Sequence, residues 1–374
     1  MKIYYRLLSI DRIGQLFEEL FSIKNLYPEE EVVIITSNPD YHPRLNRQAF
    51  ECIINNFSHK FINNHAFLCD RHENPYTDNL IKFGDGYLFH KEPCGLRREF
   101  YKKYSSKKSP FYFKLRGKDM DLGDEIMEVL GVPKNKKIVT LHVRENGYVP
   151  ELKYHSFRDC NINNCVKAID YLIKKGYYVI RLGDPTMKKL ILNSSNYIEL
   201  SHSEFTHTIA ELYLISKAEF HIGTGSGVWH IAQTCGTPIL SLNTELPFCV
   251  WGNEYDIELP RVFYSKIFNR NLSVYELANS DILTYSETNQ YKSSGLKLIE
   301  NNEDVVLEST KEMINNIKEN NTGSNIDHSY FPTIKTLYYE MGKRNPRFSY
   351  PYAQKKKIAE SYLKNNPEFL GVPF

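Results

Sequence analysis

The segment from Phe220 to Leu242, FHIGTGSGVWHIAQTCGTPILSL, constrains the fold more than any other part of the chain. It begins with a short apolar run and a turn that contains alternate glycines. Apolar residues then follow at the i, i+3, i+4 and i+7 spacing of a helix with one buried stripe: Val228, Ile231, Ala232 and Cys235. Gly236 and Pro238 come next, in the order that ends a helix, and a second apolar run follows them. The segment therefore predicts a strand, a loop, a helix and a second strand.

The same alternation recurs along much of the chain. Apolar runs that predict strands occur at 2–10, 31–36, 137–143, 177–182 and 197–200. Helical spacing separates them, for example through Ile13, Leu16, Phe17, Leu20 and Phe21, and again through residues 162–176. Strands and helices that alternate in this way predict an α/β fold with a parallel, doubly wound sheet, in which ligands bind beyond the carboxyl ends of the strands.

A chain of 374 residues is longer than one core usually holds, so two domains are expected. The alternation breaks at Arg97–Lys118, a basic and aromatic stretch in which Glu99 is the only acid. We expect a first domain at 1–118, a second domain at 119–322 that begins with a short helix at 122–130, and a tail at 323–374 that ends in a helix at 353–366.

Composition excludes several classes of protein. The formal net charge of +2 gives no overall attraction to nucleic acid or to an acidic membrane. The seven cysteines are odd in number and lack a CxxC pair, which favours a reducing environment over a disulfide framework. Charges at Lys2, Arg6, Asp11 and Arg12 interrupt the N-terminal apolar residues, and no run reaches the roughly 18 apolar residues of a membrane span. We therefore expect a cytoplasmic protein that does not bind nucleic acid.

The glycine-rich turn is the first candidate ligand site. Its residues Thr224, Gly225, Ser226 and Gly227 stand at the start of the expected helix. Bare backbone N–H groups and the positive end of the helix together suit a phosphate or diphosphate. The alternative is that the glycines only allow a tight turn.

Two further polar clusters follow expected strands: His142–Gly147 and Arg181–Pro185. One edge of a parallel sheet would bring both of them near the glycine turn. Arg144 is the most informative residue, because a guanidinium can hold two phosphate oxygens at once. A structural salt bridge is the alternative role for Arg144.

At this point the sequence resembles a known group of proteins. HVRENGY, RDCNINNCVKAIDYLIKKGYYVIRLGDP, LSHSEF and the segment at 220–238, together with RIGQL and SYLKNNPEFL, resemble an uncharacterised family of bacterial glycosyltransferases with the GT-B fold. HVR is similar to the HxR motif of fucosyltransferases, and GSGVWHIAQTCGTP is similar to the donor-binding turn and helix of heptosyltransferases. The resemblance implies two Rossmann-like domains with parallel sheets, an acceptor-side first domain, a donor-binding second domain and a tail that crosses back to the first.

The resemblance also implies roles for residues. Arg144 would contact the donor diphosphate, and Gly225, Ser226 and Gly227 would offer it hydrogen bonds, within reach of His230. Two departures limit the transfer. Fucosyltransferases with HxRxxD carry an acid where this chain has Gly147, and heptosyltransferases carry an aspartate base where RIGQL has Gln15.

Candidates for the catalytic base are Asp11, in the first loop of the first domain, and Glu145, beside Arg144. Both could equally be surface carboxylates. His142, at the end of a buried strand, is expected to orient the loop. Arg181, Asp184 and Glu204 either contact the donor or cap the segments that follow. Gly183 and Thr224, together with His142, are also expected among the donor-binding residues.

Other motifs are set aside. The DMD sequence at 119–121 matches the metal-binding DxD of glycosyltransferases with another fold, but helical spacing follows it, so helix capping is the better interpretation. Thr224 stands where a GxSxG hydrolase motif needs glycine, and no P-loop occurs. No metal site is expected.

The basic aromatic stretch is either a solvated linker or an acceptor site. In the second interpretation Arg98, Tyr101 and Lys102, helped by Lys103 and Tyr104, receive an anionic or lipid-linked acceptor near the cytoplasmic leaflet, with peripheral membrane contact.

Taken together, these features predict a metal-independent, inverting glycosyltransferase. It would move a sugar from a nucleotide-diphosphate donor, with GDP as one option for the nucleotide, to a bacterial surface glycan or its precursor. The nucleotide sugar is a co-substrate, and no cofactor is expected. The alternatives are a nucleotide-sugar epimerase or hydrolase, and a non-catalytic protein that binds sugar nucleotides.

Overall fold

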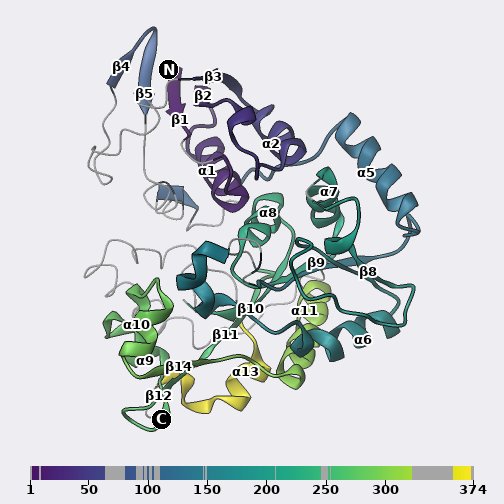
Figure 1. Cartoon of the computed structure of the whole chain (residues 1–374), viewed down its shortest axis with the longest axis vertical. Coiled ribbons are helices and arrows are strands. Elements are labelled where there is room, and N and C mark those ends of the chain that lie inside the picture. Colours follow the sequence, from purple (N-terminus) through teal and green to yellow (C-terminus); the bar gives the residue numbers. More distant parts are fainter. Residues whose placement is uncertain are drawn as a thin grey trace.

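The computed structural model describes residues 2–7, 10–63, 81–89, 96, 99–100, 103–104, 110–145, 147, 150–206, 208–245, 252, 254–321 and 357–371. Within them the chain forms two α/β units, each built on its own sheet, and a small third sheet (Figure 1). The first unit contains the N-terminus, and helix α8 of the second unit lies against it. The two Rossmann-like units expected for a GT-B fold are confirmed by this topology.

The first unit has a five-stranded sheet with the order β3-β2-β1-β5-β4. Its pairs are parallel except for the antiparallel hairpin of β4 and β5. Ile3 and Tyr5 of β1 join the larger core, while Tyr4 packs on the opposite face. The elements are β1 (Lys2–Arg6), α1 (Ile13–Leu26), β2 (Glu31–Ser37), η1 (Pro39–Tyr41), α2 (Arg47–Ile54), β3 (Ser58–Ile62), β4 (Ile81–Phe83) and β5 (Gly86–Phe89).

The second unit has a seven-stranded sheet with the order β15-β11-β10-β9-β6-β7-β8, and all its pairs are parallel. The expected doubly wound sheet is therefore confirmed. Its elements before the last strands are α5 (Lys118–Val129), β6 (Ile138–His142), η2 (Pro150–Arg158), η3 (Ile162–Cys165), α6 (Val166–Lys174), β7 (Tyr178–Arg181), β8 (Tyr197–Glu199), η4 (Leu200–His202), α7 (Ile209–Lys217), β9 (Phe220–Gly223), α8 (Gly227–Cys235) and β10 (Ile239–Thr244).

The remaining elements extend this unit. Strands β12, β13 and β14 form a small antiparallel sheet, and β15 adds a parallel edge strand to β11. The elements are β11 (Ile257–Pro260), β12 (Val262–Ser265), β13 (Arg270–Asn271), α9 (Val274–Ala278), η5 (Asp281–Thr284), α10 (Thr288–Ser293), β14 (Leu296–Ile299), α11 (Glu303–Asn321), β15 (Lys357–Ile358), α13 (Glu360–Asn365) and η7 (Pro367–Leu370).

The two units share one hydrophobic core. Ile3 of the first sheet, Leu16 of α1 and Ile231 of α8 belong to a single cluster of buried apolar side chains. At the centre of the contact the helices meet at glycines: a side-chain carbon on Gly14 would lie 2.6 Å from the Cα of Gly227. Only glycine permits backbones to approach this closely, so the N-terminus of α1 is fixed beside the N-terminus of α8.

The expected single buried stripe on α8 is corrected by this contact. Ile231 and Ala232 are fully buried and Val228 and Cys235 are half-buried, but Trp229, Gln233 and Thr234, off the stripe, are also buried. The sheet covers one face, where the indole N–H of Trp229 donates to Ser241. The other face packs against the first unit. Periodicity could not show this, because it cannot reveal a second covering layer.

Segments near the C-terminus also differ from expectation. The helix expected at 353–366 is described only from Glu360 to Asn365, because Lys357 and Ile358 pair with β11 as a strand. The described part of the tail, 357–371, packs on the second unit through α11. The tail at 323–374 is expected to cross back to the first unit, but its described part contacts the second unit, and residues 323–356 lie outside the described residues. The domain boundaries at 118 and 322 remain predictions, and β15, which lies beyond residue 322, belongs to the second sheet.

Two expectations from composition can be compared with the described residues. The described cysteines Cys52, Cys160, Cys165 and Cys235 are all free thiols. In the part of the chain that the structure describes, none of the helices combines the length and apolar character required to cross a membrane.

Candidate functional site

The loops after β6 and β9 meet where the strand order of the second sheet reverses. Strands β7 and β8 extend to one side of β6, while β9, β10 and β11 extend to the other. Such a switch point is where doubly wound sheets bind ligands. The Thr224 N–H donates to the carbonyl of His142 (3.1 Å), and the Arg144 N–H donates to Oγ1 of Thr224 (2.8 Å). Thr224 therefore joins the glycine loop to the Arg144 loop, and its side chain is buried.

The three glycines of the loop differ in what requires them. A side-chain carbon on Gly223 would lie 2.3 Å from the imidazole of His221, and one on Gly227 would lie 2.9 Å from a methyl carbon of α1. Packing therefore excludes a side chain at both. Among the described residues, a carbon on Gly225 would meet Oε2 of Glu245 at an ordinary 3.7 Å, and the φ of Gly225 lies outside the left-handed region. Within that part of the chain neither packing nor backbone strain requires glycine at 225, so a ligand could approach the backbone there.

Ser226 begins helix α8. Its hydroxyl accepts a hydrogen bond from the N–H of Trp229 at 3.4 Å and lies 3.1 Å from Nδ1 of His142. The other N–H groups of the first turn have no partner within a helix, and they carry the positive end of its dipole. His142 is buried at the base of this loop and holds Ser226, so the expected orienting role fits its position.

Burial, reinforced by the positive charge of Arg181, lowers the pKa of His142 to about 4. In the unfolded chain His142 binds a proton as the pH falls below about 6.5, whereas in the folded chain it stays neutral down to about pH 4. The free energy of unfolding therefore falls as the pH falls from about 6.5 to 4. We expect the free energy of unfolding to fall by up to about 1.4 kcal/mol per pH unit between pH 6.5 and 4 because of this group.

Urea unfolding of the wild type and of His142→Asn at pH 7 and pH 5 measures this effect. The variant should lose less stability on acidification. The comparison between variants matters because Glu19 acts in the opposite direction: burial raises its pKa to about 7, so its contribution is lost as the pH rises. Identical losses in the two proteins would contradict the assignment to His142.

Arg144 is held at the edge of the loop. Its Nη1 donates to the carbonyl of His155 (2.8 Å) and lies 3.5 Å from Oδ1 of Asp159. The side chain is 16% exposed. Burial and the nearby charge of Arg158 lower the pKa of Arg144, and a guanidinium stays charged under these conditions. Both expected roles of Arg144 are thus compatible with its position: it is salt-bridged, and it keeps part of its surface open.

The structure adds charged residues that the sequence analysis missed. We call them, together with Arg144, the arginine cluster: Arg144, Arg158, Asp159, Glu245 and Arg261. Glu245 directly follows β10 and Arg261 directly follows β11, so both lie at the same sheet edge as the glycine loop. Burial raises the pKa of Glu245, and the three arginines oppose that rise. Glu245 could have been found from the sequence, because it directly follows the apolar run ILSLNT and so stands at the carboxyl end of an expected strand.

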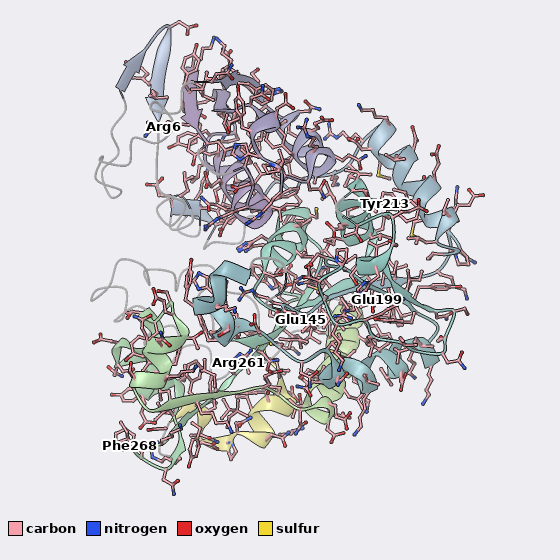
Figure 2. The ribbon with its side chains drawn as sticks, viewed as in Figure 1. Arg6, Glu145, Glu199, Tyr213, Arg261 and Phe268 are labelled. Carbon is pink, nitrogen blue, oxygen red and sulfur yellow. The ribbon has the colours of Figure 1, made fainter. Side chains whose placement is uncertain are left out.

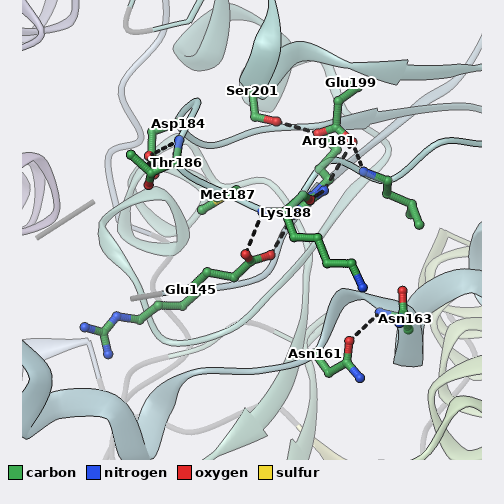
Figure 3. A network of polar contacts seen from close by, with 12 residues as sticks. Glu145, Asn161, Asn163, Arg181, Asp184, Thr186, Met187, Lys188, Glu199 and Ser201 are labelled. Atoms are coloured by element: carbon green, nitrogen blue, oxygen red, sulfur yellow. Dashed lines mark hydrogen bonds and ion pairs between the residues drawn. The ribbon is translucent and has the colours of Figure 1, made fainter. Parts of the chain in front are cut away.

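Glu145 and Arg181 form a second network on the far side of β6 (Figure 3). Arg181 is fully buried; its Nη2 donates to Glu145 (2.9 Å) and its Nη1 donates to Glu199 (3.1 Å) and to the carbonyl of Lys188 (2.6 Å). The other oxygen of Glu145 accepts the N–H of Lys188 at 2.7 Å. This position favours the structural alternative for Arg181 over donor contact, since its side chain is 0% exposed. Both carboxylate oxygens of Glu145 therefore accept hydrogen bonds within this network.

The loop after β7 is also organised by internal bonds. Asp184 is buried and accepts hydrogen bonds from the N–H and hydroxyl of Thr186, as Figure 3 shows. Gly183 has a φ of 136°, which allows Met187 to pack over it. The capping alternative thus fits Asp184 better than donor contact. Glu204 is exposed in the loop after η4.

Residues of the first unit border the site. Asp11 and Arg12 are exposed just before α1, and Arg12 is close enough to contribute to the lowered pKa of His155 in η2. Gln15 donates to the buried carboxylate of Glu19 (2.7 Å) instead of facing outward. His230 lies against the first unit, where its Cδ2 would be 3.1 Å from a side-chain carbon on Gly14.

The expected acceptor residues Arg98, Tyr101 and Lys102 lie outside the described residues. Their neighbour Lys103 donates to the carbonyls of Asn25 (2.8 Å) and Leu26 (2.9 Å), and so caps the end of α1. The hydroxyl of Tyr104 also donates to Asn25 (3.1 Å). These two residues attach the stretch to the first unit.

Metal binding finds no support at the DMD sequence. Asp119 and Asp121 lie in the first turn of α5, where carboxylates complement the helix dipole. Among the described residues no group of three or more His, Cys, Asp or Glu side chains is arranged to hold a metal ion.

Comparisons with known proteins give distant similarities only. No protein-family model matches the chain, and no curated protein matches it. The chain is similar to a family 9 glycosyltransferase from Veillonella parvula, with 12% identity over 65% of this chain and 80% of the other and a TM-score of 0.39. It is also similar to the iron-containing dodecameric glycosyltransferase TibC of enterotoxigenic E. coli, with 14% identity, 87% and 80% coverage and a TM-score of 0.38.

A third similarity is to E. coli ADP-heptose LPS heptosyltransferase II, with 10% identity over 65% of this chain and 84% of the other and a TM-score of 0.35. These three solved structures are glycosyltransferases, and one of them is a heptosyltransferase. At these TM-scores they do not by themselves assign an activity to this chain. The link to fucosyltransferases stays a prediction.

Proposed function

We propose that the protein is a glycosyltransferase that takes a sugar from a nucleotide-diphosphate donor. The observation that carries the proposal is the meeting of the glycine loop, the N-terminus of α8 and Arg144 at the switch point of the second sheet. Backbone N–H groups, a helix dipole and a guanidinium are the groups that bind a diphosphate. Gly225 supports the proposal further, because no packing contact among the described residues requires it to lack a side chain.

The catalytic effect would be electrostatic. As the bond between the sugar and the diphosphate breaks, negative charge grows on the departing phosphate oxygens. Fixed N–H groups and the charge of Arg144 stabilise that charge without reorganising. The nearby N-terminus of α1, held by the contact of Gly14 with Gly227, adds a second positive helix end.

The acceptor would enter from the side of the first unit. Asp11 is exposed just ahead of Ile13, whose side chain contacts the position of Gly227, so it is the candidate base that remains accessible. Glu145 is less suited, since both its oxygens already accept hydrogen bonds. We propose a cytoplasmic, metal-independent enzyme that acts on a bacterial surface glycan or its precursor.

Isothermal titration calorimetry with UDP, GDP and ADP, and with UDP-glucose, GDP-mannose and ADP-glucose, tests the proposal. We expect at least one diphosphate to bind with a dissociation constant below roughly 1 mM, and the affinity to be unchanged by a chelator. Absence of binding across the panel would refute a donor site. Complete consumption of a bound donor without an acceptor would instead favour an epimerase or hydrolase.

A further inference from the structure

Several buried polar atoms without a hydrogen-bond partner gather beside the glycine loop. Within the described residues they belong to side chains at the carboxyl edge of the second sheet and at the end of η2: Nε of Arg158, Oδ1 of Asp159, Oγ1 of Thr244, Oε1 of Glu245 and Nε of Arg261. Of these, Oδ1 of Asp159 has an ion-pair contact with Arg144 at 3.5 Å but no hydrogen bond. A buried polar atom without a partner is costly, and native proteins contain few of them. Such a concentration in one place indicates that a polar ligand supplies the missing bonds.

These side chains are held in place by their neighbours. Nη2 of Arg261 donates to the carbonyl of Asp159 (2.6 Å) and to Sγ of Cys160 (2.9 Å), and its side chain is almost fully buried. The Arg261 N–H donates to the carbonyl of Thr244 (2.9 Å), which joins the ends of β10 and β11. Figure 2 shows Arg261 in the second unit, below Glu145. The arrangement is therefore built into the sheet edge.

Two contacts place these unpartnered atoms next to the proposed diphosphate site at Gly225 and Arg144. Oε2 of Glu245 lies 3.7 Å from the position that a side-chain carbon on Gly225 would occupy. Oδ1 of Asp159 lies 3.5 Å from Nη1 of Arg144. A group attached to a diphosphate between Gly225 and Arg144 would thus lie next to both carboxylates.

The chemistry of the unpartnered atoms selects the kind of ligand. Two are guanidinium donors, two are carboxylate acceptors and one is a hydroxyl that can do either. A phosphate offers acceptors only, so it could not supply the donors that the two carboxylate oxygens lack. A sugar ring is uncharged, and its hydroxyl groups can both donate and accept hydrogen bonds.

We propose that Glu245 and Asp159, with Thr244, Arg158 and Arg261, form the subsite for the hydroxyl groups of the donor sugar. This inference rests on the proposed function, because it takes the diphosphate to lie between Gly225 and Arg144. Glu245 and Asp159 accept hydrogen bonds from sugar hydroxyls, and the two arginines donate to the ring or hydroxyl oxygens. Nucleoside diphosphates contain ribose but lack the transferred sugar, so they do not use the subsite.

The test is calorimetric titration of Glu245→Gln with a nucleoside diphosphate and with the matching nucleotide sugar, from the pair that the wild type binds. We expect the affinity for the diphosphate to stay within about twofold of wild type, and the affinity for the nucleotide sugar to fall by about tenfold or more, since a site built to bind hydroxyls discriminates strongly. Glu128→Gln, on the exposed face of α5, is the matched control and should change neither affinity.

Equal losses for both ligands would overturn the inference, because they would place the nucleotide in the subsite. Wild-type affinity for both ligands would overturn it too, and would leave ordered water as the partner of these atoms. If Glu245→Gln has a lowered melting temperature, Thr244→Val replaces it, because this change removes the hydroxyl at nearly constant volume. Its affinities for the diphosphate and for the nucleotide sugar are then compared with those of the wild type in the same way. Failure of the wild type to bind any diphosphate refutes the proposed function itself, and the subsite with it.

Discussion

Replacing Arg144 by alanine is expected to lower the turnover number well over tenfold, by a factor of about 10², while leaving the fold intact. The guanidinium lies at the switch point of the second sheet, and its loop is bonded to the glycine loop through Thr224 (2.8 Å). A charge fixed beside the departing diphosphate acts in the transition state, where each tenfold in rate corresponds to about 1.4 kcal/mol. Steady-state kinetics with a bound donor measures the effect.

The control for this variant is Arg144→Lys. A lysine keeps the positive charge but cannot hold two phosphate oxygens in parallel, so its turnover number should lie between those of the wild type and the alanine variant. The melting temperatures of all three proteins should agree to within a few degrees, because the side chain of Arg144 makes one short hydrogen bond, to His155 (2.8 Å). A turnover number near the wild-type value in Arg144→Ala would refute the role.

Replacing Gly14 by alanine is expected to destabilise the protein by about 1–3 kcal/mol, even though alanine favours a helix. The new side-chain carbon would lie 2.6 Å from the Cα of Gly227, and a backbone atom cannot rotate away as a side chain can. Helices α1 and α8 would have to separate. Because α8 carries the glycine loop at its start, donor affinity should fall together with stability.

Gly225→Ala is the matched control for this steric effect. The added carbon meets no atom closer than 3.7 Å, so the free energy of unfolding should stay within roughly 0.5 kcal/mol of the wild type. Urea unfolding of both variants gives the comparison. A stable Gly14→Ala variant would show that the two units separate easily, contrary to the shared core.

The alternation of strands and helices in the second unit was predictable from local pattern. Apolar runs placed β6, β7, β8, β9 and β10 correctly, and Gly236, with a φ of 75°, ends α8 as expected. The meeting of the His142 and glycine loops also followed, because carboxyl ends of parallel strands share one edge. These features depend on residues that are close in sequence or on a general rule of topology.

The partners of charged side chains were not predictable in the same way. Glu145 stands beside Arg144 in the sequence, yet its carboxylate binds Arg181, because successive residues after a strand point to different sides. Arg261 reaches Asp159 across a long stretch of chain, through the pairing of β10 with β11. The second covering layer on α8 came from the other unit. Each of these depends on tertiary packing that no local spacing encodes.

The central claim is that the glycine loop binds the diphosphate of a donor, and titration of Gly225→Ala with the diphosphate that the wild type binds tests it most directly. The claim predicts an affinity at least tenfold weaker than that of the wild type, with an unchanged unfolding free energy, because the added carbon stands where the phosphate approaches the backbone. Wild-type affinity in this variant would contradict the claim.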